Sequence, residues 1–489
     1  MWLGGLSINI SEKKILLIVA ATSQLIMQLI ANMTVVALPD IAIALNFSAE
    51  GLLWVNLIYL MSFVSFSLPF AKIISQYGIK KSTKLSIILL FISIMVSFLS
   101  VNEYMFLLSR LLQGLTSASL AISIYVIIVE EFQEHEMGSA LGMVSSAGYV
   151  GMLMAPSFMG FVIYFADWKF AFLILIPILL VLLYLLNNVT KEWTGEKKPI
   201  DNKGSFFYIV IMALFTYGLT ELDVYGAIFL VISLIILAIF IKIEKKVEEP
   251  ILNFNLINNT RYVIGNYAAM VTYFTTTIAI TALSFHLQYI LNFEEYVVSM
   301  ILIISPIITI GMSNIGGMLS NKFDPRLISA TAMIFLAISM AIYFFVDHIP
   351  FEIILVGCAF QGIGNGLFSA PNNKYTLTIV DEEDLADASS ILSSNKEFGK
   401  ILSTGIYTLI LSIFFGNQTL GPEDLDYLLV QSSNLMMFIC MILSVSAVIL
   451  LLYSFMKYEK GINKGTVEFF KSIAPKRVLK KIKYLIYLS

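Results

Sequence analysis

Four charged residues lie well inside long apolar runs of this sequence, away from the ends of the runs, where a charge needs a physical reason to be present. Arg110 stands in the run 104–129, and Lys396, Glu397 and Lys400 stand together in the run 388–414. Placing an ionised side chain at membrane depth costs roughly 2.5–3.5 kcal/mol on insertion scales. Arg110 would line the outer part of a central cavity and influence proton or solute binding, or its side chain would extend outward to the membrane surface, or it would brace the first helix through a backbone carbonyl. Glu397 would either carry a proton or form a salt bridge that locks one conformation.

Two further runs carry rows of amide side chains. Gln24, Gln28 and Asn32 recur every four residues and so share one face of a helix. Gln361 and Asn365 form a similar row that alternates with glycines. Such rows can face a water-filled cavity and hydrogen-bond a solute, or they can join helices within a membrane. We keep both interpretations for each row and treat these residues as candidates for binding.

The composition identifies the solvent in which these residues must be held. The chain has 489 residues, of which 58% are hydrophobic and 13% are charged, whereas a soluble domain carries about 25% charged residues. In lipid, every backbone polar group needs an internal partner, and runs of about 20 apolar residues therefore form helices. The predicted spans are 15–38, 51–71, 84–101, 104–129, 139–165, 169–187, 205–220, 226–242, 262–286, 297–318, 327–346, 351–378, 388–414 and 431–456. We therefore predict an all-α integral membrane protein with fourteen transmembrane helices.

The distribution of the 30 basic residues predicts the orientation of the chain. Arg110, Lys396 and Lys400 fall within predicted helices, and Lys169 falls in the other set of loops. The other 26 lie in the termini and in every second loop. By the positive-inside rule both termini face the cytoplasm of a cell whose plasma membrane the chain crosses. The tail 457–489 is predicted to be either a basic amphipathic helix on the inner leaflet or a disordered polybasic end.

Short stretches recur at nearly constant separation along the chain. The loop after the second helix, through Gly78 and Lys80, matches the loop after the tenth helix, through Asp324 and Arg326, at an offset of 246. Two such halves are the signature of transporters that rock around a site at the membrane midplane. The predicted units are a six-helix bundle 1–190, a linker with two inserted helices 191–250, a second six-helix bundle 251–456 and the tail 457–489.

A series of motifs in a fixed order carries a resemblance to a known family. In the first half these are Val35 to Pro39, Trp54 and Tyr59, Gly78 with Lys80 and Lys81, Arg110 with Gln113 and Gly114, and Gly151 with Pro156 and Gly160. Later ones are Trp168 to Pro177, Glu249 to Leu256, Pro371 to Asn373, and Lys396 with Gly399. The chain resembles the fourteen-helix, drug:proton antiporter branch of the major facilitator superfamily over nearly its whole length. Many relatives carry an aspartate at the position of Ile30, and the acidic residue of their first loop motif is Ser75 here.

The resemblance implies a fold and a function. It implies the major facilitator fold, the pattern of antiporters in the helix that holds Gly151, Pro156 and Gly160, and proton-coupled efflux of small amphipathic compounds by alternating access. We predict a cytoplasmic gate in which the acidic residues 130–136 pair with nearby lysines. The candidates for this gate are Lys72, Gly78, Lys80, Lys81, Glu130 and Arg326.

The remaining expectations concern chemistry and partners. The sequence has no GxxxxGK[ST] phosphate loop, so the energy source should be an ion gradient, of protons as the resemblance implies. We expect no enzyme activity, no cofactor and no metal site, since no Cys/His cluster occurs. We expect a monomer whose partners are the lipid bilayer and a small-molecule substrate, without nucleic acid. The alternatives are a transporter of one specific metabolite and a membrane scaffold or sensor that has lost transport.

Overall fold

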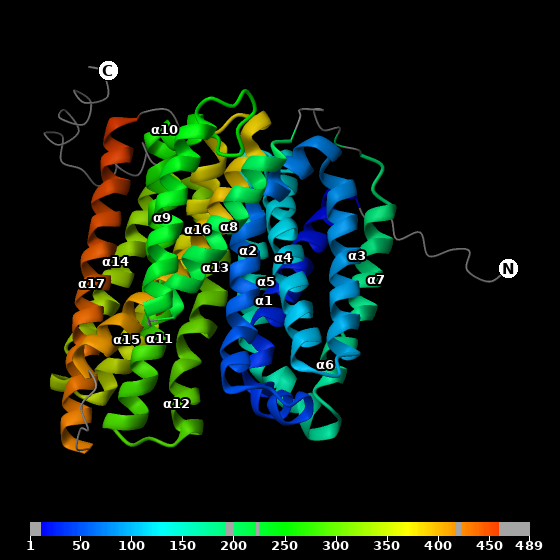
Figure 1. Ribbon diagram of the computed structural model, residues 1–489. Helices are drawn as coiled ribbons and strands as arrows, with labels where there is room; N and C mark the ends of the chain where they lie inside the picture. Colours follow the sequence, from blue (N-terminus) through cyan, green and yellow to red (C-terminus); the bar gives the residue numbers. More distant parts are fainter. Residues whose placement is uncertain (1–10, 192, 194–199, 222–223, 416–421, 459–489) are drawn as a thin grey trace, which may run out of the picture.

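Long helices run side by side through the bundle that Figure 1 shows. The structure is a computed structural model that describes residues 11–191, 193, 200–221, 224–415 and 422–458. Within those ranges, fourteen helices are long and apolar enough to cross a membrane, and no strand occurs. The predicted all-α class and number of spans are therefore confirmed. The predicted tail helix, 457–489, lies almost wholly outside the described residues.

The first half contains six spans. They are α1 (Glu12–Leu45), α2 (Ala49–Tyr77), α3 (Ile79–Phe98), α4 (Glu103–Glu131), α5 (Glu134–Phe165), and a sixth span formed by α6 (Lys169–Leu173) and α7 (Ile176–Asn187). α1 continues past Pro39 to Leu45, whereas the sequence predicts that it ends at Leu38. A proline removes only one backbone donor, and packing of a transmembrane helix against its neighbours tolerates that loss.

Two inserted helices separate this half from the next six spans. The insertion is α8 (Asn202–Thr220) and α9 (Val224–Glu244). The second half comprises α10 (Phe254–Asn258), α11 (Thr260–Phe285) with the turn η1 (His286–Ile290), α12 (Glu295–Leu302), α13 (Ile304–Lys322), α14 (Pro325–Phe344), η2 (Val346–His348), α15 (Phe351–Thr378), η3 (Glu382–Asp384), α16 (Leu385–Phe415) and α17 (Pro422–Lys457). The short elements flank or extend the spans.

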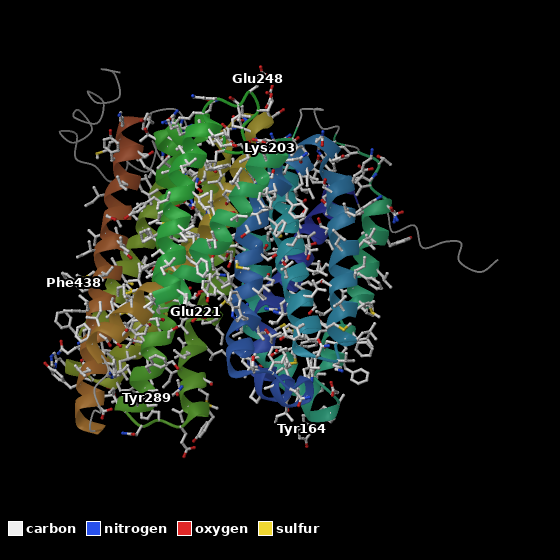
Figure 2. The ribbon with its side chains drawn as sticks, viewed as in Figure 1. Tyr164, Lys203, Glu221, Glu248, Tyr289 and Phe438 are labelled. Carbon is white, nitrogen blue, oxygen red and sulfur yellow. The ribbon has the colours of Figure 1, made fainter. Side chains whose placement is uncertain are left out.

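The bundle has two chemically different ends. One end holds the α2–α3, α4–α5, α13–α14 and α15–α16 connections, and we call it the lysine-rich end because Lys72, Lys80, Lys84 and Lys322 lie there. The other we call the opposite end. Figure 2 shows Lys203 and Glu248 at the lysine-rich end and the exposed rings of Tyr164 and Tyr289 at the opposite end.

The two halves repeat each other in their side-chain contacts. Gln113 Nε2 donates to Ser97 Oγ at 2.8 Å, and Tyr343, which follows Ser97 by the offset of 246, donates to Gln361 Oε1 at 3.0 Å. Lys80 Nζ donates to the Val189 carbonyl, after the sixth span, at 2.6 Å. The equivalent Arg326 donates to carbonyls at the end of the last span. The repeat predicted from the loops is thus present in the tertiary contacts.

The inserted helix α8 lies across the seam between α2 and α16. The Tyr208 hydroxyl donates to the Val64 carbonyl of α2 at 3.4 Å. On the other side the rings of Phe215 and Phe398 lie 5.3 Å apart, which attaches α8 to α16. The insertion therefore contacts both halves.

Candidate functional site

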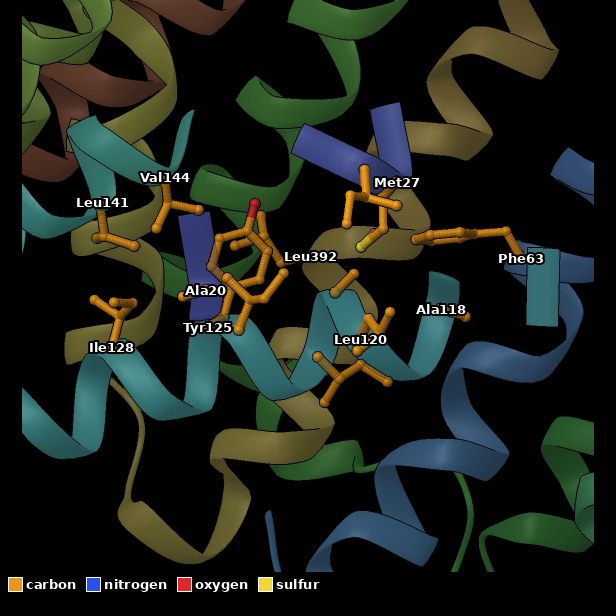
Figure 3. Packing of buried hydrophobic residues seen from close by; sticks show 14 of the residues in the cluster. Ala20, Met27, Phe63, Ala118, Leu120, Tyr125, Ile128, Leu141, Val144 and Leu392 are labelled. Carbon is orange, nitrogen blue, oxygen red and sulfur yellow. The ribbon is translucent and has the colours of Figure 1, made fainter. Parts of the chain in front are cut away.

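A cavity of about 210 Å³ lies between the two halves. Its lining residues are Gln24, Met27, Gln28, Ala31, Asn32 and Val35 of α1, Asn56, Tyr59, Leu60 and Phe63 of α2, Ala121 and Tyr125 of α4, Tyr273 of α11, and Ser393, Lys396, Glu397 and Lys400 of α16. Figure 3 shows three of these, Met27, Phe63 and Tyr125, beside the buried apolar side chains around them. The structure thus brings the first amide row and the charged cluster of α16, far apart in sequence, to one site.

The charged cluster of α16 forms one wall of the cavity. Lys396 is buried, and its Nζ donates to the Tyr125 hydroxyl at 2.8 Å and to Asn373 Oδ1 at 2.7 Å. Its ammonium also lies 4.7 Å from the centroid of the Tyr125 ring, within the range of a cation–π contact. Glu397 is buried as well and forms an ion pair with Lys400 at 2.9 Å. One ammonium of this cluster therefore has a carboxylate partner, and the other has uncharged partners.

The amide row on α1 forms another wall. Asn32 Nδ2 donates to the Gln28 carbonyl of its own helix at 2.6 Å. Gln24 is only partly buried and lies against α5, where a Cβ on Gly148 would be 3.1 Å from its amide nitrogen. Neighbouring Asn56 of α2 accepts a hydrogen bond from Thr34 at 3.3 Å. These amides retain donors and acceptors that a solute in the cavity can use.

Arg110 does not line this cavity but stands behind one of its walls. Its Nε donates to the Val55 carbonyl at 3.0 Å, and its Nη1 donates to the Ile30 carbonyl at 3.1 Å. The guanidinium lies 4.8 Å from the ring centroid of Tyr59, a lining residue. Arg110 therefore joins α4 to α1 and α2, which agrees with the bracing interpretation, and it places a positive charge directly behind Tyr59.

The second amide row also lies outside the lining. Gln361 accepts from Tyr343, and Asn365 Oδ1 accepts from Thr276 at 2.7 Å. Of the adjacent glycines, Gly362 is so close to α13 that a Cβ there would lie 2.6 Å from the Ser305 carbonyl oxygen. This geometry favours the helix-joining interpretation for Gln361 and Asn365.

The predicted antiporter-motif residues differ in their surroundings. A Cβ on Gly151 would lie 3.0 Å from the Leu25 carbonyl carbon and closer to its oxygen, so this glycine permits the close packing of α5 on α1. Pro156 lies within α5 without ending it. A Cβ on Gly160 would meet nothing within 4 Å.

Hydrogen bonds between the two halves gather at the lysine-rich end. Lys72 of α2 pairs with Asp387 of α16 at 2.6 Å. Lys374 of α15 donates to the Glu134 carbonyl at the start of α5 at 2.5 Å. Asn321 of α13 also donates to Ser139 at 2.8 Å. The cavity is therefore closed toward the lysine-rich end in this conformation.

The predicted gate residues have partners other than the expected ones. Of the acidic group, Glu131 pairs with Lys191 and Glu136 pairs with Lys13. Lys80 and Arg326 bind carbonyls within their own halves. Gly78 supplies the turn between α2 and α3 at φ 88°. Lys81 is exposed and Glu130 is half-buried. Lys72 is the predicted gate residue that crosses between the halves, and its carboxylate partner is Asp387.

The sequence interpretation missed several residues that line the cavity and one residue of the contact between the halves. Asn56 is a polar residue within an apolar run and could have been found on that signal. Tyr125 and Tyr273 carry no comparable signal, because aromatic residues are common in every span. Asp387 precedes the predicted span 388–414 by one residue, so the sequence places this acidic residue in a loop.

Comparisons with known proteins find one family and many distant relatives. The sequence profile of the Major Facilitator Superfamily matches residues 20–243 and 267–489. The riboflavin transporter RibZ of Clostridioides difficile is 23% identical over 405 residues, covering 81% of this chain and 88% of that protein. The drug efflux pump JefA of Mycobacterium tuberculosis is 24% identical over 398 residues, covering 79% and 78% respectively.

Two solved structures share the fold. The human organic anion transporter MFSD10 superposes with a TM-score of 0.64 at 10% identity, covering 90% of this chain and 99% of that one. The proton:xylose symporter XylE superposes with a TM-score of 0.63 at 14% identity, covering 94% and 99%.

Proposed function

The chain belongs to the Major Facilitator Superfamily, and we propose that it is a proton-coupled exporter of small amphipathic compounds. Membership in this family makes it a multi-pass membrane transporter and not an enzyme. The observation that carries the finer proposal is the polar cavity between the halves, which holds an ion pair of Glu397 and Lys400. The likeness to a drug efflux pump supports export.

The proposed mechanism is alternating access. The lysine-rich end is the cytoplasmic side of the plasma membrane, in accord with the positive-inside rule. The bundles 1–190 and 251–456 rock about the cavity, with 191–250 as the linker that carries α8 and α9. In the observed conformation the cytoplasmic seam is closed by contacts such as that between Lys72 and Asp387. We propose that a monomer completes this cycle.

Glu397 is the proposed proton carrier. It is buried, lines the cavity and holds Lys400 as a carboxylate. Proton binding and the ion pair exclude each other, because a neutral carboxyl no longer attracts the ammonium. A protonation step at Glu397 therefore rearranges the charges of the cavity, which is what coupling to a proton gradient requires.

The experiment is transport in proteoliposomes with an imposed pH gradient. Three probes with the same ring system and different charges serve as solutes. They are the anion naphthalene-2-sulfonate, the neutral naphthalene-2-sulfonamide and the cation trimethyl(2-naphthylmethyl)ammonium. We expect gradient-driven flux in wild type and loss of its gradient dependence in Glu397→Gln. Glu131→Gln is the matched control, because Glu131 pairs with Lys191 at the lysine-rich end and does not line the cavity.

Two outcomes would contradict the proposal. Flux in wild type that ignores the pH gradient would exclude proton coupling. A folded protein without flux for any probe would favour the scaffold alternative. A carrier for one specific solute is the second candidate, favoured by the likeness to a riboflavin transporter, and transport of riboflavin alone in the same liposomes would establish it.

A further inference from the structure

The charges that line the cavity do not balance. The lining contains the ammonium groups of Lys396 and Lys400 and the carboxylate of Glu397. Lys400 lies 2.9 Å from that carboxylate and neutralises it. The described lining residues therefore leave one positive charge without a negative counterpart.

That remaining charge belongs to Lys396. Its ammonium is held by the Tyr125 hydroxyl and by the amide oxygen of Asn373, both of them uncharged. The residue is only 5% exposed. Burying a charge is costly unless it is paired with an opposite charge or well hydrogen-bonded. An ammonium has three donors, and the structure accounts for two of them, so one donor remains for an acceptor in the cavity.

A second cation stands behind the cavity wall. Arg110 is fully buried, and its partners are two backbone carbonyls and the amide oxygen of Gln113. Its Nη2 is buried without a hydrogen-bond partner. Because its guanidinium lies over Tyr59, its field reaches the cavity through a single ring. Charges in a low-dielectric surrounding interact more strongly than in water.

The rest of the lining defines the body of a ligand. Tyr59, Tyr125, Tyr273 and Phe63 offer ring faces and edges, and the α1 amides offer hydrogen bonds. Rings pack well against another aromatic ring. At about 210 Å³ the cavity lies below the roughly 300–1,000 Å³ of drug-sized pockets, so the ligand is compact.

We propose that the substrate is a compact aromatic anion whose negatively charged oxygen binds the Lys396 ammonium, and that lipophilic cations are excluded. This inference rests on the proposed function in that it takes the cavity as the transport site. Export of an anion is also favoured by an inside-negative membrane potential, since the charge moves down the electrical gradient. Lys396 thus acts as the residue that sets charge specificity.

The test measures binding to the full chain in lipid nanodiscs, without any gradient, for the same three naphthalene probes. Their rings match, so differences in affinity report the charge. We expect wild type to bind the sulfonate tightest and the trimethylammonium probe weakest. Lys396→Gln should weaken sulfonate binding by about 10- to 100-fold, the range for losing a hydrogen bond to a charged group. Sulfonamide binding should change much less, and Lys396→Arg should retain sulfonate binding.

Thermal unfolding of both variants checks that the fold is kept. If Lys396→Gln is unstable, the affinities of the three probes for wild type and for Lys396→Arg still test the charge preference. The inference is overturned if the trimethylammonium probe binds tightest, if Lys396→Gln weakens the sulfonate and the sulfonamide equally, or if none of the three binds. Gradient-driven flux of the trimethylammonium probe would overturn this inference but would agree with the proposed export. Anion-selective binding without flux would agree with the charge specificity of the cavity but would contradict the proposed export.

Discussion

Adding one methyl group at Gly138 should open the seam at the lysine-rich end. Gly138 of α5 faces α13, where a Cβ would lie 2.5 Å from Asn321 Oδ1 and closer still to Ser320 Oγ and the Gly317 carbonyl oxygen. Side chains of Ser320 and Asn321 can rotate away, but the Gly317 carbonyl is backbone. Real Cβ contacts essentially never fall below 3.0 Å, so α5 and α13 must separate in Gly138→Ala.

The magnitude follows from the cost of overpacking, which is about 1–3 kcal/mol. If the strain is relieved in the conformation where this seam is open, the equilibrium shifts toward it by about 5- to 150-fold. Because the proposed alternating access needs both conformations, transport should fall while the protein stays folded.

The assay is labelling of a single reporter cysteine by an impermeant maleimide. Ser369 is 5% exposed and hydrogen-bonds Ser145 across the seam at 3.1 Å, so Ser369→Cys is shielded while the seam is closed. The two native cysteines are buried, and their background is measured in the parent. Labelling should be faster in Gly138→Ala than in wild type by up to about 150-fold, the upper end of the shift in the conformational equilibrium.

Gly160→Ala is the matched control on the same helix, since its Cβ would meet nothing within 4 Å. It should label at the wild-type rate. Equal labelling in Gly138→Ala and wild type, or an equal increase in the two variants, would show that the seam does not depend on this close approach.

Three further substitutions test contacts in the bundle, one within the first half and two between the halves. Arg110→Gln should destabilise the protein by about 1–3 kcal/mol, because it removes the buried hydrogen bonds that join α4 to the Val55 carbonyl of α2 and the Ile30 carbonyl of α1. An unchanged unfolding midpoint would refute the bracing role. Lys72→Gln and Asp387→Asn should each speed labelling of the reporter several-fold, since the pair joins the halves. The increase in labelling rate caused by Lys72→Gln or Asp387→Asn is modest, because Lys72 is partly exposed and an exposed ion pair contributes little. The double variant should label no faster than the single ones, whereas additive effects would show that the two residues act separately.

The sequence alone determined the spans, their number and the repeat. In lipid, a helix must satisfy its own backbone, so an apolar run of sufficient length specifies a span without reference to its neighbours. The offset between Lys80 and Arg326 likewise predicted equivalent positions, which the structure fills with equivalent contacts. These are local properties of the chain.

Only the tertiary structure decided which polar residues share a site. Gln28 and Gln361 look alike in sequence, yet the packing of α1 turns the first toward the cavity while the packing of α15 turns the second toward Tyr343. Lys72 and Asp387 are 315 residues apart, and no local pattern could pair them. The rotation of each helix depends on the shapes of its neighbours, so the position of a side chain around the helix is a property of the assembled bundle and not of its own span.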